Sequence, residues 1–167
     1  QKEREKIEKY SIIYTLHGAA QLESTAENHY STMSIEELCA LPVADLAALD
    51  SALFLWATFQ QILKVLWLIE ACVLGFIYKS VAFVWLKKNN KADAGSMALA
   101  SGEGQRGNLP VGYQGEPEAA DCQHHFIISP IEAHSKRPDE THNKNISLMG
   151  NLPSVIYALC KRTKRFI

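Results

Sequence analysis

Histidines are the residues of this chain best suited to binding a metal, and their spacing does not favour a metal site. The six histidines include the neighbours His124 and His125, with His134 and His142 further along. Adjacent residues on a strand point to opposite faces, and no carboxylate or thiolate stands at a recognised metal-ligand spacing from them. We therefore expect surface or loop histidines and no metal.

The cysteines do not point to a metal or a disulfide scaffold. Cys39, Cys72, Cys122 and Cys160 are far apart and form no Cys-x-x-Cys pair. Such spacing indicates neither a zinc ribbon nor a disulfide framework. The chain also begins with a charged run and not with an apolar signal-peptide core, so we expect a reducing, cytoplasmic compartment.

A glycine-rich stretch, Gly102–Gly107, matches the Gly-x-Gly-x-x-Gly pattern that holds a dinucleotide pyrophosphate. That chemistry requires a strand before the glycines and a helix N-terminus after them. Here Pro110 follows too soon for a helix to form. We expect no dinucleotide site.

Charge is almost balanced, with a formal net value of -1, so nucleic-acid binding would need a local cationic patch. The basic residues near the end of the chain could form one, and a short basic run of this kind is also typical of a solvated tail. They are Lys161, Arg162, Lys164 and Arg165.

The elements that would position these residues follow an α/β pattern. A chain of 167 residues with 47% hydrophobic and 21% charged residues is typical of one folded domain, residues 1–167. Its first half alternates strands with helices, as a parallel sheet requires. We expect a strand at 10–15, a short helix capped by Ser34, a strand at 53–58, a helix at 60–72 and a strand at 77–86.

The apolar run 62–86 could be mistaken for a membrane span. Lys64, Glu70 and Lys79 interrupt it and Gly75 divides it. Ionisable groups inside a span are costly, so we expect no membrane segment.

The second half is less regular. Residues 88–120 predict a long irregular loop with one weak strand at most. A strand at 125–129, a helix from Pro138 to Met149 that stops at Gly150, and a strand at 155–159 complete the expected elements.

Three blocks of sequence carry a family resemblance. They are residues 26–34 with the apolar strand 53–58, residues 81–87, and residues 126–140. In this order and spacing they resemble the adenine-N6 methyltransferases of the MT-A type, which include the messenger-RNA methylating enzyme and phage and bacterial DNA relatives. The resemblance covers about residues 9–163.

The resemblance implies a Rossmann-like S-adenosylmethionine methyltransferase fold, with a mostly parallel sheet in permuted order flanked by helices. It implies S-adenosylmethionine as cofactor and adenine in DNA or RNA as substrate, in a bacterial or phage-like setting. The family continues into a segment with Trp and Gly-Asn, whereas this chain stops at Ile167, so we expect the fold to be truncated at its C-terminus and cofactor binding to be weakened.

The catalytic motif of the family is missing. In relatives the first strand runs into Asp-Pro-Pro-Trp or Tyr, which accepts the adenine amino group and stacks on the base. Here Leu16, His17, Gly18 and Ala19 occupy those positions. The acceptor, the rigid turn and the stacking ring are all lost, and catalysis by positioning depends on each of them.

Other family positions are retained. The loop His-Ser-x-Lys-Pro-Asp-Glu of relatives lies beside the cofactor, and Arg137 replaces its Lys, which keeps the charge but changes the geometry. The resemblance assigns the cofactor to His134, Ser135, Lys136, Arg137, Asp139 and Arg162, and the substrate-side loop to Asn28, His29 and Tyr30.

These observations predict an adenine-N6 methyltransferase-like domain that is inactive or impaired. Two alternatives stay open. The chain could be a non-catalytic scaffold of the same fold that binds nucleic acid or pairs with an active homologue, or it could be a decayed or artificial sequence without selected function.

Overall fold

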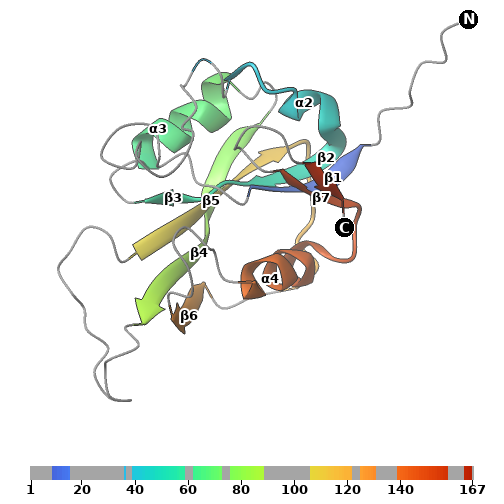
Figure 1. The fold of residues 1–167 in the computed structure, drawn as a ribbon. Coiled ribbons are helices and arrows are strands. Elements are labelled where there is room, and N and C mark those ends of the chain that lie inside the picture. Colours follow the sequence, from blue (N-terminus) through green and yellow to red (C-terminus); the bar gives the residue numbers. More distant parts are fainter. Residues whose placement is uncertain are drawn as a thin grey trace, which may run out of the picture.

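The computed structural model describes residues 9–15, 36, 39–58, 62–72, 76–88, 106–121, 125–130, 139–157 and 164–166. In this part of the chain, one sheet lies between two layers of helices (Figure 1). The elements are β1 (Tyr10–Thr15), α2 (Val43–Leu46), β2 (Ala47–Phe54), β3 (Ala57–Thr58), α3 (Ile62–Trp67), the π-helical turn η4 (Leu68–Cys72), β4 (Ile77–Lys88), β5 (Arg106–Gln114), β6 (Phe126–Pro130), α4 (Glu140–Met149), β7 (Ser154–Tyr157) and β8 (Lys164–Phe166).

The strands of this sheet lie in the order β6-β4-β5-β2-β1-β7-β8, and β3 pairs with β5. β1 is parallel to β2 and β7, and β4 is parallel to β6, whereas β5 is antiparallel to β2, β3 and β4, and β8 is antiparallel to β7. The sheet is therefore mixed, and the expectation of a mostly parallel sheet was wrong in this respect. The reason is that β5 runs back between β4 and β2.

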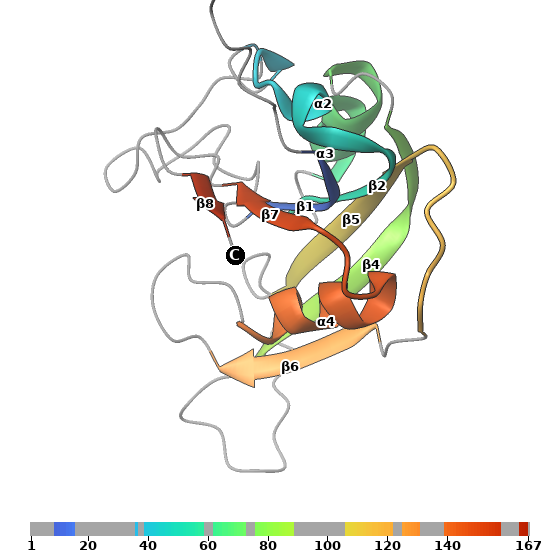
Figure 2. The same ribbon diagram turned by 90° about the vertical axis from the view of Figure 1, so that its right-hand side faces the viewer.

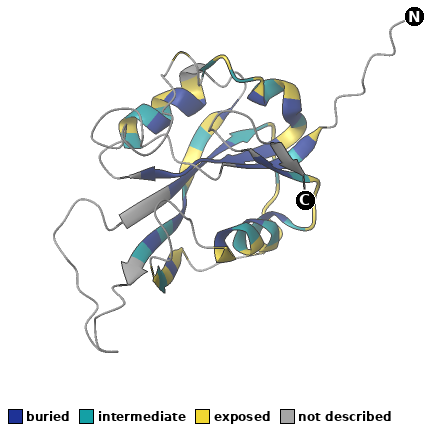
Figure 3. Ribbon diagram, in the orientation of Figure 1, coloured by how far each residue is buried: buried dark blue, intermediate teal, exposed yellow. Residues whose placement is uncertain are grey.

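Each face of the sheet buries its own apolar cluster, because successive strand residues point to opposite faces. Ile13 and Leu53 pack with Val65 and Ile69 under α2, α3 and η4. On the other face, a second cluster of buried residues lies under α4: Ile12, Tyr14, Ala52, Phe54, Trp56, Ala82, Phe83, Trp85, Leu109, Val111, Ile127, Met149 and Ile156. Figure 3 shows the buried central strands between helices whose outer sides are exposed.

Most expected elements of the first half are present. The strand at 10–15 is confirmed as β1, the helix at 60–72 as α3 with η4, and the strand at 77–86 as β4. The second strand begins earlier than predicted, at Ala47, and is interrupted at Leu55 and Trp56 before β3. Ser34, the predicted cap, lies outside the described residues, although Glu36 is helical.

The second half is more regular than its sequence suggests. Residues 88–120 were predicted to form a long loop with one weak strand at most. They contain β5, a long strand in the middle of the sheet, so the prediction of a weak strand was wrong. Gly107 pairs with Thr58 and Trp85 within this strand. The end of the glycine-rich stretch is thus part of a strand, whereas a dinucleotide loop is followed by a helix; residues 102–105 lie outside the described residues.

The strand predicted at 125–129 and the helix ending at Gly150 are confirmed as β6 and α4, and the last predicted strand corresponds to β7. Gly150 has φ 87°, a conformation that favours glycine after a helix. Beyond β7, residues Lys164–Phe166 pair with it as β8, so this part of the basic segment is not simply a solvated tail.

The cysteine prediction needs a correction at one residue. Cys39 is half-buried against the apolar cluster under α2, α3 and η4, and it is disulfide-bonded. Sequence spacing missed this because it does not show which side chains the fold brings together. Among the described residues, no helix has the length and apolar character needed to cross a membrane.

Candidate functional site

The carboxyl ends of β1, β2, β4, β6 and β7 point toward the same edge of the sheet. β1, β2 and β7 run in one direction, and because β2 and β4 are both antiparallel to β5, β4 and its parallel partner β6 share that direction. β1 lies between β2 on one side and β7 on the other (Figure 2). Open α/β sheets bind ligands outside the carboxyl ends of their strands, where the strand order changes direction. This carboxyl edge is the candidate site.

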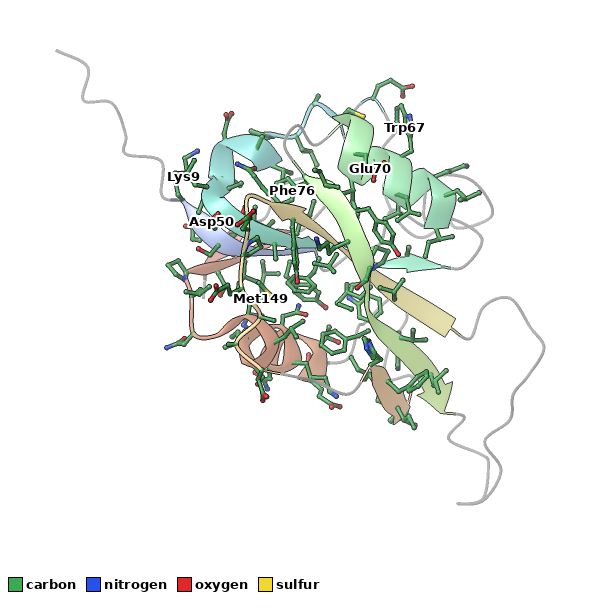
Figure 4. All side chains as sticks on the ribbon, turned by 180° about the vertical axis from the view of Figure 1, so that it is seen from behind. Lys9, Asp50, Trp67, Glu70, Phe76 and Met149 are labelled. Carbon is green, nitrogen blue, oxygen red and sulfur yellow. The ribbon has the colours of Figure 1, made fainter. Side chains whose placement is uncertain are left out.

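The opposite edge of the sheet is closed by structural contacts. The Lys9 ammonium donates to the Asp45 carbonyl at 2.7 Å, and the Glu116 amide donates to Asp50 Oδ1 at 3.0 Å. Gly115, with φ 67°, turns the chain there, and a side chain at this position would collide with Asp50. Lys9 and Asp50 mark this edge in Figure 4.

A buried aromatic chain lies beneath the carboxyl edge. Trp56 Nε1 donates to the Tyr14 hydroxyl at 2.7 Å, which links the end of β1 to the segment between β2 and β3. The Trp56 and Trp85 rings are 6.1 Å apart in an edge arrangement, and Trp85 Nε1 donates to the Ser129 carbonyl at 3.4 Å. These contacts connect β1, the segment between β2 and β3, β4 and β6.

The first turns of α4 complete this region. The His142 ring lies 6.4 Å from the Tyr14 ring, with 32° between the planes. Figures 1 and 2 both place α4 on the face of the sheet opposite α2 and α3. The Lys144 ammonium is 3.4 Å from Glu140 on the same helix and 5.7 Å from the centre of the Phe83 ring. On α4, His142 therefore lies beside Tyr14 of β1, and Lys144 lies over Phe83 of β4.

The sequence profile of the MT-A70 family matches residues 16–153, which is most of the chain. The chain belongs to the MT-A70 family. It is also similar to the Type II methyltransferase M.MunI of Mycoplasma sp, with 42% identity over 64 residues, or 38% of this chain. The matched stretch spans 27% of that relative's length. The domain is accordingly methyltransferase-like, in a family that methylates adenine in nucleic acid.

Chain connectivity joins the predicted catalytic position of the MT-A70 domain to the carboxyl edge. Leu16 follows Thr15, the last residue of β1, directly in the chain. Residues 16–19 themselves lie outside the described part of the chain, as do the substrate-side residues Asn28, His29 and Tyr30.

The predicted cofactor residues of the MT-A70 domain belong to the segments that follow β6 and β7. His134, Ser135, Lys136 and Arg137 come between β6 and α4, and Arg162 comes between β7 and β8, all outside the described residues. Asp139 is described, and it is exposed at the N-cap position of α4, where its side chain makes no capping hydrogen bond. Of these residues the structure describes Asp139, and for the others it gives only the strands that precede them in the chain.

Sequence reasoning missed the Tyr14, Trp56 and Trp85 chain. Each of these residues was counted as part of an apolar strand, and the available signal was that their polar ring atoms need partners when buried. Thr141 and Asn145 are fully buried on α4. They were missed too, because polar side chains of a helix are expected on its solvent face.

Electrostatics and metal chemistry add no second site. Burial raises the pKa of the Tyr113 phenol, but this residue is on β5 at the end that pairs with the start of β4, away from the carboxyl edge. No group of three or more metal-ligating side chains occurs among the described residues. The described His125 instead places Nδ1 3.0 Å from the Ala82 carbonyl.

Proposed function

We propose that this MT-A70 domain has a Rossmann-like sheet in permuted order and that it holds S-adenosylmethionine and a target adenine at the carboxyl edge. The observation that carries the proposal is the position of β1. It lies between β2 and β7, and its carboxyl end leads straight into Leu16. A ligand crevice at such a switch point is the general rule for open α/β sheets.

The permuted order is supported by the sheet itself. β7 comes near the end of the chain and yet pairs in parallel with β1, the first strand. β1 and β7, at whose carboxyl ends the crevice is proposed, thus come from opposite ends of the sequence.

S-adenosylmethionine, when bound, supplies the methyl group that an adenine nitrogen attacks. The residues that would hold it follow the carboxyl ends of β6 and β7 and the start of α4. Asp139 fits this role because it is exposed at the start of α4. The complete proposed set is His134, Ser135, Lys136, Arg137, Asp139 and Arg162.

Substrate recognition is proposed for Asn28, His29 and Tyr30, with adenine in DNA or RNA as the target.

Catalysis is proposed to be absent or impaired. An attacking adenine nitrogen needs a fixed acceptor for its amino hydrogens, and Leu16 has none. His17 and Gly18 replace the two prolines that would stiffen the turn, and Ala19 offers no ring for the base to stack on. Because this chemistry relies on positioning and fixed dipoles, the loss of all three features removes most of the rate.

The first experiment is calorimetric titration of the folded chain with S-adenosylmethionine and S-adenosylhomocysteine. We expect saturable binding of both, together with no methyl transfer to adenine-containing DNA or RNA. A folded chain that releases no heat and gains no thermal stability with either ligand would contradict the cofactor proposal.

A motif-restored variant separates cofactor binding from catalysis. It combines Leu16→Asp, His17→Pro, Gly18→Pro and Ala19→Trp. We expect cofactor affinity to stay similar and methyl transfer to rise by about 10²-fold or more. The matched control keeps the other three changes but carries Leu16→Ala, and equal transfer by both variants would refute the role of the acceptor.

A scaffold without catalysis is the second candidate, and β8 favours it. This strand joins the sheet beside β7 and carries Lys164 and Arg165, so the basic segment is anchored to the fold. We expect salt-sensitive binding of duplex DNA, and replacing both residues by alanine should reduce the slope of log K against log salt by about 1.8. Unchanged slopes would argue against this candidate.

A further inference from the structure

The side of α4 that faces the sheet is polar over its first half. Its three buried residues are spaced by four: Thr141 and Asn145 are 0% exposed and Met149 is 2% exposed. Helices that cover a sheet normally present apolar side chains at such positions. Only Met149, near the end of the helix, meets that expectation.

The polar atoms of this first half have no hydrogen-bond partners. Thr141 Oγ1, His142 Nδ1 and both amide atoms of Asn145 are buried and unpaired. A buried polar group without a partner carries the full cost of leaving water.

The second half of α4 is held firmly. Leu148 and Met149 pack against the aromatic cluster of β1, β2 and β4. The Ala120 amide donates to the Leu148 carbonyl at 2.7 Å, which satisfies one of the last carbonyls of the helix. Figure 4 marks Met149 at this end of α4.

From this asymmetry we infer that residues 140–145 form a flap that opens from the sheet while the Leu148–Met149 end stays in place as its hinge. Opening returns the unpaired atoms of Thr141, His142 and Asn145 to water. It also separates His142 from Tyr14, the residue two places before Leu16, so the flap controls access to the end of β1. This inference is independent of the proposed cofactor and reaction.

Native-state amide hydrogen exchange on the unliganded full chain tests the flap. Opening unwinds the flap. In an α-helix the Lys144 and Asn145 amides bond to the carbonyls of residues 140 and 141, so unwinding exposes both amides. The Ala120 amide bonds instead to the Leu148 carbonyl at the hinge. We expect the Lys144 and Asn145 amides to exchange at least about tenfold faster than the Ala120 amide. Equal protection of all three amides would overturn the inference.

Two substitutions remove the unpaired polar atoms and keep side chains of similar volume. Thr141→Val and Asn145→Leu are expected to slow exchange at residues 144 and 145 by about tenfold or more, because the buried atoms no longer gain from reaching water. The control is Asn143→Leu, which makes the same chemical change at an exposed position of the same helix. If it slows exchange as much as Asn145→Leu, helix propensity explains the effect and the flap is refuted. If a variant does not fold, the comparison within the natural chain decides alone.

Discussion

Removal of the Tyr14 hydroxyl tests the hydrogen bond that joins β1 to the segment between β2 and β3. Trp56 Nε1 donates to this hydroxyl at 2.7 Å. Both residues are buried: Trp56 is 0% exposed and Tyr14 is 2% exposed. Tyr14→Phe keeps the ring and its packing but leaves the indole N–H without that acceptor. A buried donor that loses its partner costs about 1–3 kcal/mol, so we expect the free energy of unfolding to fall by that amount.

The assay is urea denaturation followed by tryptophan fluorescence, with thermal unfolding as a second measure. A loss of about 2 kcal/mol corresponds to a fall of roughly 4–8 °C in the midpoint for a chain of this size. Tyr78→Phe is the matched control, because Tyr78 lies half-exposed on β4, and it should change stability by no more than about 0.5 kcal/mol. A Tyr14→Phe effect as small as that of the control would refute the proposed importance of the bond.

A double-mutant cycle assigns the loss to the pair. Trp56→Phe alone also leaves space in the core, so the single effects differ in origin. The coupling between Tyr14→Phe and Trp56→Phe should be about 1 kcal/mol. Additive effects would mean that the two rings stabilise the core separately.

Three further changes test the packing of α4, the turn at Gly150 and the ionisation of Tyr113. Met149→Ala should lower the free energy of unfolding by about 2–5 kcal/mol in denaturant titration, because this side chain is 2% exposed against the aromatic cluster. Gly150→Ala should cost about 1–2 kcal/mol in the same assay, because φ is 87°, and an effect near zero would show that the turn relaxes. Tyr113 has a pKa raised above 10.0 by burial, so the folded state holds the phenolic proton more tightly than the unfolded state. Stability should therefore be full below pH 10 and fall above it, and Tyr113→Phe should reduce that slope.

The sequence alone predicted the elements with strong local signals. β1, β4 and α4 were found because short runs of apolar, β-branched and aromatic residues, a helix start near Pro138 and a stop at Gly150 are encoded within a few residues. The family was also recognisable, since blocks such as 126–140 keep the order and spacing on which the resemblance rests.

β5 shows where local signals fail. Arg106–Gln114 contains Gly, Pro and Asn, which disfavour a strand when taken alone. The strand forms because it pairs with β4 and β2 on its two sides, and such pairing outweighs intrinsic preference. The mixed direction of the sheet follows from the same insertion and could not be read from the alternation of elements.

The sequence by itself was enough to recognise the family resemblance and to predict from it that residues 16–19 depart from the catalytic motif. The tertiary structure decided which strand ends share an edge, that β7 lies beside β1, and that Tyr14 meets Trp56 and His142. It also decided that Thr141 and Asn145 are buried without partners. The physical reason is that hydrogen bonding and burial depend on contacts between residues far apart in the chain, which no local pattern records.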